Sequence, residues 1–319
     1  MTTKEFGNSS LYICRNIVKI GVSIVSLGLF ALAARAVEIS DPANLLSAKA
    51  QSRGGATSAS TLYHDALFQN PASSVFTNRY AVTAGYLGTG NALAASIVDT
   101  QSGPVGGGVY YVRRDLNNAS NLSSTSLGNY TRTEEHMGLA LMGKLSNTFG
   151  VGTSVRYTYR RTDDPAVDSA LHSSSAWNFD VGARFLASPF MTLGLVAQNL
   201  MTDNMGVYPK RVTAALEYMP IPGIFVSGQM FKVDNKNLKA GFTLPNPDKN
   251  VGWSAGAEYV FSMSASLRAG YVNNPTWNQT LATAGIGYTS PEFSVDYALQ
   301  KGVGTTQELS HLVTVTGYF

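Results

Sequence analysis

Cysteine is almost absent from this 319-residue chain, which has one, Cys14. A single cysteine excludes an intramolecular disulfide framework and a zinc site built from several thiolates. Charged residues make up only 13% of the chain, whereas a soluble helical enzyme carries more Lys and Glu on its exposed faces. No apolar run reaches the ~20 residues that a membrane-spanning helix needs. We therefore expect neither a helical membrane protein nor a soluble helical enzyme.

The first 36 residues have the features of a cleavable secretory signal peptide. Basic residues precede a 15-residue apolar run from Ile20 to Ala34, which Arg35 and Ala36 follow. Cleavage after Ala36 removes Cys14, four of the 23 basic residues and one of the 20 acidic residues, so 19 of each sign remain. A formally neutral mature chain gives no support to nucleic-acid binding. We expect export from the cytoplasm.

The mature chain divides near residue 79 into two regions of different texture. Residues 37–78 contain clusters of Ala, Ser and Gly and the short motif Asn70-Pro71-Ala72, and nothing there alternates like a strand. Residues 79–319 form segments of about ten residues with alternating apolar and polar positions, separated by Gly, Pro, Asn and Ser. We expect an irregular segment at 37–78 and an all-β region at 79–319.

Fourteen strands fit the all-β region. A closed single-chain bacterial barrel with both ends in the periplasm needs an even number, and short periplasmic turns then alternate with longer extracellular loops. Residues 237–246 form either a further strand or part of a long loop. The expected strands lie near residues 79–89, 91–101, 105–115, 134–146, 149–162, 175–188, 190–201, 210–221, 223–234, 250–263, 265–274, 279–289, 292–301 and 307–319.

The two faces of these strands differ in chemistry. Trp253 and Tyr259 alternate with Ser254 and Glu258, for example. A soluble β-sandwich alternates too, but its outward face should be rich in Lys and Glu and its edges guarded by charge. Sparse charge and aromatic residues near strand ends favour a transmembrane antiparallel β-barrel in the outer membrane of a Gram-negative bacterium, with lipid against its apolar face.

Charged residues on the opposite face then point into the lumen. Two interpretations are open: a structural network of ion pairs that fills a narrow interior, or a polar track or gate that contacts cargo. The lumen-facing candidates are Arg156, Asp180, Arg184, Glu217, Glu258, Arg268 and Asp296.

Several of these features together resemble the long-chain fatty-acid transporter (FadL-like) family of outer-membrane barrels. The motif Asn70-Pro71-Ala72 just before the first strand and the count of fourteen resemble that family. The C-terminal half is similar to its smaller PorV-like relatives, in the series Gly256-Ala257-Glu258-Tyr259, Leu267-Arg268-Ala269-Gly270-Tyr271 and Phe293-Ser294-Val295-Asp296-Tyr297.

The resemblance implies a hatch at residues 37–78 that plugs the lumen. It also implies passive uptake or export of hydrophobic, fatty-acid-like small molecules, released laterally or inward. The PorV-like resemblance implies the alternative, a scaffold barrel that docks envelope or secretion proteins. Asn70 and Pro71 then either gate the lumen or cap a turn.

The terminal Tyr318 and Phe319 resemble the assembly signal that the barrel-assembly machinery reads in outer-membrane proteins. A chance aromatic ending is the alternative, and the two are compatible because Phe319 also completes the apolar face of the last strand.

The sequence motifs considered for catalysis or cofactor binding support neither function. Gly138 to Lys144 matches Gly-x-x-x-x-Gly-Lys, but Leu145 follows and the segment alternates like a strand, so it is no phosphate loop. A Ser–His lipase on the barrel rim is the one enzyme alternative, and no Gly-x-Ser-x-Gly elbow supports it. We expect no enzyme, no cofactor and no metal site. Four histidines lack metal-ligand spacing and are expected in loops or at the surface: His64, His136, His172 and His311.

Overall fold

The computed structural model describes residues 46–87, 92–115, 132–162, 173–201, 208–234, 248–261, 264–304 and 309–319. All of them lie in one compact unit, Arg35–Phe319. Four features expected from the sequence fall outside these residues: the signal peptide, the first part of the hatch at 37–45, the candidate strand at 237–246, and His172.

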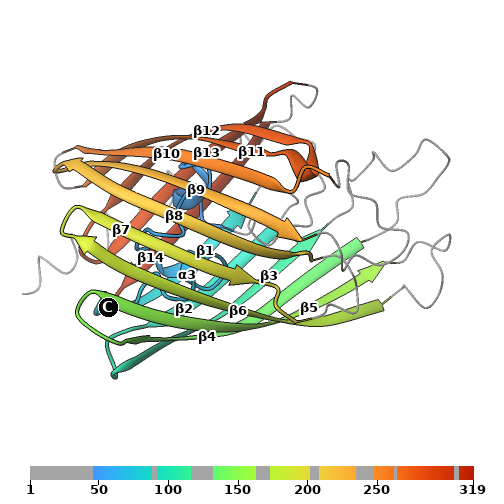
Figure 1. Cartoon of the computed structure of the whole chain (residues 1–319), viewed down its shortest axis with the longest axis horizontal. Coiled ribbons are helices and arrows are strands. Elements are labelled where there is room, and N and C mark those ends of the chain that lie inside the picture. Colours follow the sequence, from blue (N-terminus) through green and yellow to red (C-terminus); the bar gives the residue numbers. More distant parts are fainter. Residues whose placement is uncertain are drawn as a thin grey trace, which may run out of the picture. The chain divides into compact units, whose positions relative to one another are not determined.

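The described residues form fourteen antiparallel strands that close into a barrel, as expected (Figure 1). Each strand pairs with its neighbour in sequence, and the last closes on the first, with Ala84 opposite Val315. The strands are β1 (Tyr80–Leu87), β2 (Ala92–Asp99), β3 (Val105–Asp115), β4 (Arg132–Lys144), β5 (Phe149–Thr162), β6 (Ser173–Ser188), β7 (Met191–Gln198), β8 (Lys210–Ile221), β9 (Ile224–Asp234), β10 (Val251–Phe261), β11 (Ala265–Asn274), β12 (Gln279–Thr289), β13 (Phe293–Gly302) and β14 (Leu309–Tyr318).

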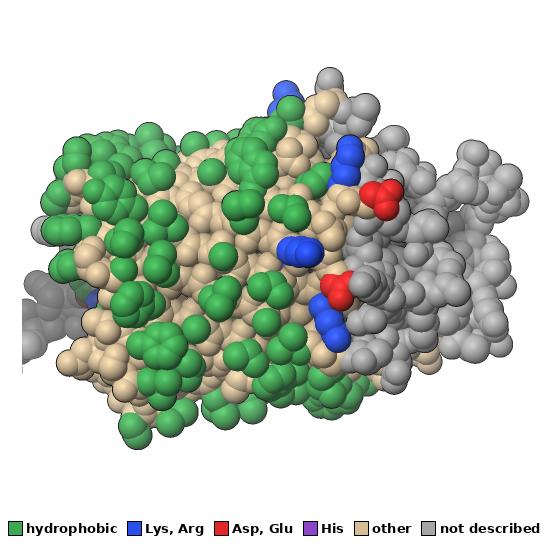
Figure 2. Space-filling view, in the orientation of Figure 1, with side chains coloured by type: hydrophobic (Ala, Val, Ile, Leu, Met, Phe, Trp, Pro, Cys, Tyr) green, Lys and Arg blue, Asp and Glu red, His purple; other side chains and the backbone are tan. Residues whose placement is uncertain are grey.

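Polar side chains face the inside of this barrel and apolar side chains the outside. In β2, Leu93 is 61% exposed while Ser96 is 4% exposed. Figure 2 shows hydrophobic side chains spread over the outer surface of the strands. Water would oppose such a surface, whereas a bilayer accepts it. The closed barrel and its outer face therefore match an outer-membrane β-barrel and not a sandwich. Among the described residues, no helix is long and apolar enough to cross a membrane.

Short turns join the strands at one end of the barrel, which we name the turn end. In the β4–β5 turn, Ser146 Oγ accepts the backbone N–H groups of Thr148 and Phe149 at 3.2 and 3.0 Å. Gly223, with φ +88°, provides the left-handed residue of the β8–β9 turn. Connections at the opposite loop end are mostly longer. Short turns at one end and longer connections at the other are typical of outer-membrane barrels, in which the short turns are periplasmic.

Phe319 lies at the turn end, where its backbone N–H donates to the carbonyl of Tyr80 at 2.9 Å. Its ring is 76% exposed and packs edge-on against the Tyr80 ring, with 6.0 Å between centroids. Tyr318 is half-buried in β14 and lies under the guanidinium of Arg79. The first and last strands are thus joined beside the aromatic terminus.

Residues 46–78, named here the hatch segment, pack inside the barrel (Figure 1). They contain only two short helices, α2 (Ala48–Gln51) and α3 (Tyr63–Ala66), and a single-turn helix, η3 (Pro275–Trp277), lies between β11 and β12. Phe68 is 1% exposed and its ring centroid lies 4.1 Å from that of Tyr110 on β3. The hydrophobic core of the molecule therefore lies between the hatch segment and the barrel wall.

Candidate functional site

The motif Asn70-Pro71-Ala72 lies fully inside the lumen against β5 and β6. Asn70 is 0% exposed. Its Nδ2 donates to the carbonyls of Ser58 at 2.7 Å and Ala183 at 3.2 Å, and its Oδ1 accepts the N–H of Ala72 at 3.0 Å. The side chain therefore caps a turn within the hatch segment and also ties that turn to β6.

Glycines on the wall make room for this turn. A Cβ atom on Gly182 would overlap Asn70 Oδ1 and approach Pro71 Cδ, and one on Gly152 would overlap the backbone of Pro71. Gly152 and Gly182 are directly opposite each other in the β5–β6 register. Because neither carries a side chain, the backbone of the hatch segment lies directly on the wall.

Arg184, also on β6, adds two charge-assisted hydrogen bonds to the hatch segment. Its Nε donates to the carbonyl of Ala59 at 3.1 Å and its Nη1 to the carbonyl of Ser73 at 2.6 Å. The residue is 5% exposed. A guanidinium thus clamps two distant parts of the hatch segment to the same strand.

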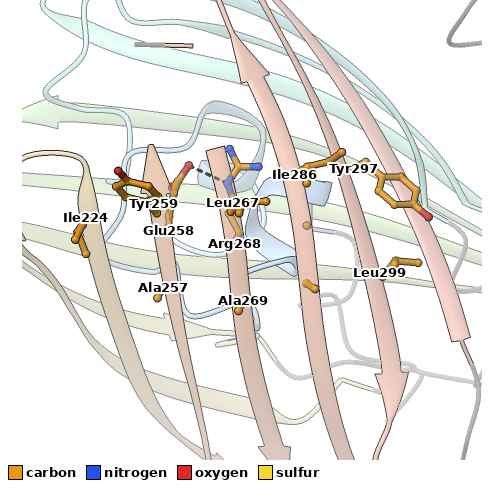
Figure 3. A pocket seen from close by; sticks show the side chains of 12 residues that line it. Ile224, Ala257, Glu258, Tyr259, Leu267, Arg268, Ala269, Ile286, Tyr297 and Leu299 are labelled. Atoms are coloured by element: carbon orange, nitrogen blue, oxygen red, sulfur yellow. Dashed lines mark hydrogen bonds and ion pairs between the residues drawn. The ribbon is translucent and has the colours of Figure 1, made fainter. Parts of the chain in front are cut away.

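The opposite wall, β8 to β13, holds the hatch segment through Arg53. The Arg53 guanidinium lies 2.5 Å from Glu217 Oε2 and 3.5 Å from Glu258 Oε2. Glu258 also pairs with Arg268 at 2.8 Å (Figure 3), and Arg268 pairs with Asp296 at 2.6 Å. These five side chains form one buried ionic network that joins the hatch segment to four strands.

Glycines leave room for the backbone of the hatch segment on this wall as well. Cβ atoms on Gly256 and Gly270, which are opposite each other in the β10–β11 register, would overlap the backbone of Arg53 and Gly54. Gly54 has φ +64°, a left-handed conformation that favours glycine. Both walls therefore contact the hatch segment through its main chain.

A second ionic network surrounds Glu134 on β4. Its carboxylate binds His136 Nε2 at 2.7 Å and Arg160 Nε at 3.0 Å, and lies 3.6 Å from Arg114. His136 Nδ1 also lies 3.0 Å from Thr158 Oγ1. Its members come from β3, β4 and β5, and Glu134 and His136 are each 0% exposed.

The expected location of the histidines was wrong for two of them. His136 occupies an inward position of β4, in the same alternation as Glu134, instead of a loop or the surface. His64 is 3% exposed in the hatch segment, with its Nδ1 2.8 Å from Ser96 Oγ. In both cases the buried ring nitrogens have hydrogen-bonding partners. His311, by contrast, is half-exposed on the outer face, as expected.

The structure places all seven lumen-facing candidates on inner-face positions. Glu217, Glu258, Arg268 and Asp296 belong to the Arg53 network described above. Arg156 lies 3.6 Å from Asp180, whose Oδ1 accepts the N–H of Asn199 at 2.7 Å. Arg184 donates to the carbonyls of Ala59 and Ser73 in the hatch segment. Sequence reasoning missed Arg53 and Glu134, although Arg53 stands out as a cation beside Gly54 and Gly55 in a segment with few charges.

Asp65 in α3 is buried within the hatch segment. The N–H and Oγ–H groups of Ser47 both donate to its carboxylate, each at 2.6 Å. Burial raises the pKa of the Asp65 carboxyl, against smaller opposing effects of His64 and Ser47, while Asp296 adds to the rise. This pair joins the start of the hatch segment to α3.

Two expectations about chemistry can be placed on the fold. Gly138 to Lys144 lies within β4, where no helix follows that could present its N-terminus to a phosphate. In the part of the chain that the structure describes, no three His, Cys, Asp or Glu side chains are grouped so that they could hold a metal ion.

Comparison with known proteins identifies the fold. No family model and no curated protein sequence matches the chain. Solved structures do match over 86% of this chain. They include the CymD monoaromatic hydrocarbon channel (97% of that chain, TM-score 0.61, 15% identity), the Ralstonia pickettii toluene transporter TbuX (98%, 0.62, 14%) and a Pseudomonas aeruginosa FadL homologue (98%, 0.57, 11%). The chain therefore has the fold of the FadL-type outer-membrane channels, which confirms the expected fold resemblance.

Proposed function

We propose that this protein is a passive outer-membrane channel for hydrophobic small molecules and that the hatch segment is its gate. The observation that carries the proposal is the packing of the hatch segment between two walls, with Asn70 held against Gly182 on one side and Arg53 paired with Glu258 on the other. A segment so placed obstructs the lumen. It is joined to the wall by noncovalent contacts, so it can move without a covalent step.

Monoaromatic hydrocarbons are the cargo class that the comparisons favour over longer fatty acids. Two of the matched proteins, with TM-scores of 0.61 and 0.62, are named as a monoaromatic hydrocarbon channel and a toluene transporter. The direction we propose is uptake, from the loop end to the turn end. Movement would follow the concentration gradient, without a nucleotide, a metal or a covalent step.

Uptake of radiolabelled toluene by Gram-negative cells tests this function. Cells are the right setting because a phospholipid vesicle admits toluene without a channel. Cells that produce the protein should accumulate toluene faster at low external concentration than cells that produce an unrelated outer-membrane barrel in equal amount. The two kinds of cell would accumulate toluene at the same rate, and a long-chain fatty acid at the same rate, if the folded barrel transported neither. That result would contradict the proposal and favour the scaffold alternative.

A second readout identifies the cargo directly. Mass spectrometry of small molecules extracted from the detergent-purified barrel should find an apolar molecule that the unrelated barrel lacks. Substitution of Asn70 by alanine should reduce the amount bound if the hatch segment forms part of the binding surface.

A further inference from the structure

Two hollows lie along the same wall of the lumen, one on each side of Arg53. The loop-side hollow, of about 40 Å³, is lined by inward residues of β8 to β12 and by five residues of the hatch segment, Leu46, Gln51, Gly54, Gly55 and Gln69. The turn-side hollow, of about 340 Å³, is bounded by Lys49 to Leu62 and by inward residues of the same strands. Gly54 and Gly55 line the first hollow and Arg53 lines the second, so this part of the hatch segment lies between them.

The order of inward residues along β10 shows how the hollows are aligned. Ser254 lines the loop-side hollow, Gly256 contacts the backbone of Arg53, and Glu258 and Val260 line the turn-side hollow. Neighbouring β11 repeats this order with Asn274, Gly270 and Ser266. The two hollows are therefore consecutive sections of one track on the wall.

The barrier between these sections is a four-residue turn, residues 52–55, which we name the latch turn. The N–H of Gly54 donates to Thr283 Oγ1 at 3.1 Å, and Thr283 Oγ1 donates to the carbonyl of Ser52 at 3.1 Å. Arg53 then crosses the track to reach Glu217 and Glu258. One side chain thus fastens the latch turn to β8 and β10.

The loop-side hollow is suited to a polar or hydrated content. Three buried side-chain atoms that line it have no hydrogen-bonding partner within the described structure: Ser254 Oγ, Asn274 Oδ1 and Gln279 Nε2. Buried polar atoms of this kind are usually satisfied by water or a solute. The section of the track on the loop side of the latch turn can therefore hold water while Arg53 is paired with Glu217 and Glu258.

Lys49 offers the carboxylates of the track an alternative cation. It lines the turn-side hollow together with Glu217 and Glu258, so these carboxylates would stay next to a positive charge after Arg53 leaves. A buried carboxylate without any partner would oppose the open state. The track thus contains the charges needed for two arrangements of the hatch segment.

We propose that these hollows are the two halves of the exit path and that Arg53 is the latch between them. The proposal rests on the proposed channel function and adds its route and its gating residue. Release of Arg53 from Glu217 and Glu258 joins the hollows and opens the lumen through the turn end, towards the periplasm. The β8 to β12 ladders are continuous along this track, with one register shift at the β8–β9 turn, so the path runs along the wall and not through it.

Ion conductance in planar bilayers tests the latch without any cargo. Arg53→Ala should raise the conductance several-fold over the unsubstituted protein, and Glu217→Gln should raise it by a smaller factor, because Glu258 still binds Arg53. Arg113→Ala removes the same charge from an exposed side chain and should change nothing. Heat-modifiable migration on gels verifies that each barrel is folded. Unchanged conductance of both folded latch variants would overturn the proposal.

Blocking by a thiol reagent tests the route. Ser266 and Ser154 are buried, at 5% and 2% exposure, on opposite walls, and the mature chain expected after signal cleavage has no cysteine. In the Arg53→Ala background, a reagent should block the conductance of Ser266→Cys and leave that of Ser154→Cys unchanged. Block at Ser154→Cys alone would place the path on the other wall and overturn the route.

The conductance and the uptake experiments can fail separately. An open Arg53→Ala channel in a protein that does not accelerate toluene uptake would leave the latch standing and contradict the proposed cargo. A closed Arg53→Ala channel in a protein that does accelerate uptake would contradict the latch alone.

Discussion

Asn70 of the hatch segment lies on Gly182 of β6 so closely that a Cβ atom at position 182 would overlap its side-chain oxygen. The two residues are 112 positions apart in the sequence, yet the contact sets how near the hatch segment comes to the wall. The motif Asn70-Pro71-Ala72 and the glycines of β5 and β6 therefore form one packing unit.

Substitution of Gly182 should loosen the hatch segment. Gly182→Ala inserts a methyl group against Asn70 and Pro71, and overpacking of this kind costs about 1–3 kcal/mol. Hydrogen exchange of residues 46–78 should speed up accordingly. Gly143→Ala is the matched control, because a Cβ atom at Gly143 would meet nothing within 4 Å. Equal exchange in the two variants would show that the close contact does not hold the hatch segment.

Asn70→Asp should weaken the same contact through lost hydrogen bonds. The new carboxylate keeps an acceptor for Ala72 but cannot donate to the carbonyls of Ser58 and Ala183. Leaving such buried groups unsatisfied costs about 1–3 kcal/mol. Protease cleavage within the hatch segment should become faster. Asn147→Asp, at an exposed position of the β4–β5 turn, should have no effect, and an equally resistant Asn70→Asp protein would rule out an anchoring role for this amide.

The Asp65 contact should hold α3 of the hatch segment more firmly in mild acid than at neutral pH. Because burial raises the pKa of Asp65 in the folded protein, its stabilising contribution is complete below the ordinary Asp pKa of about 3.9 and is lost as the pH rises through the raised value. Hydrogen exchange of α3, corrected for the intrinsic pH effect, should show this loosening in the unsubstituted protein and a flat profile in Asp65→Asn. Exchange of α3 that speeds up towards mild acid in the unsubstituted protein but not in Asp65→Asn would contradict the assigned sign.

Phe319→Ala should reduce the yield of assembled barrel. The backbone pairing of Phe319 with Tyr80 survives the substitution, since it involves only main-chain groups, whereas the exposed ring that we propose as the assembly signal is removed. We expect several-fold less heat-modifiable barrel in the outer membrane. Leu309→Ala, on the outer face at the other end of β14, controls for lost apolar surface. Normal assembly of Phe319→Ala would support a chance aromatic ending.

The fold could be predicted from the sequence because alternation is local. The spacing of Trp253, Ser254, Glu258 and Tyr259 fixes which side chain lies on which face, whatever the neighbouring strand is. For the same reason five strands were predicted with both ends correct: β3, β5, β8, β11 and β12. In each of the other nine strands at least one end is shifted, by one to three residues.

The partners of the charged residues could not be predicted in this way. Arg53 and Glu258 are 205 positions apart, and only the closure of the barrel and the position of the hatch segment bring them together. His136 is different. Its place on the inner face follows from the alternation of β4 that also places Glu134 there, so this position could be predicted from the sequence.

Removal of the hatch segment tests the central claim most directly. The conductance of the barrel lacking residues 41–76 should be compared with that of the whole chain in planar bilayers, with folding verified for both. A hatch segment that obstructs the lumen predicts a large increase in conductance after the deletion. The same low conductance from a folded barrel without these residues would contradict the account.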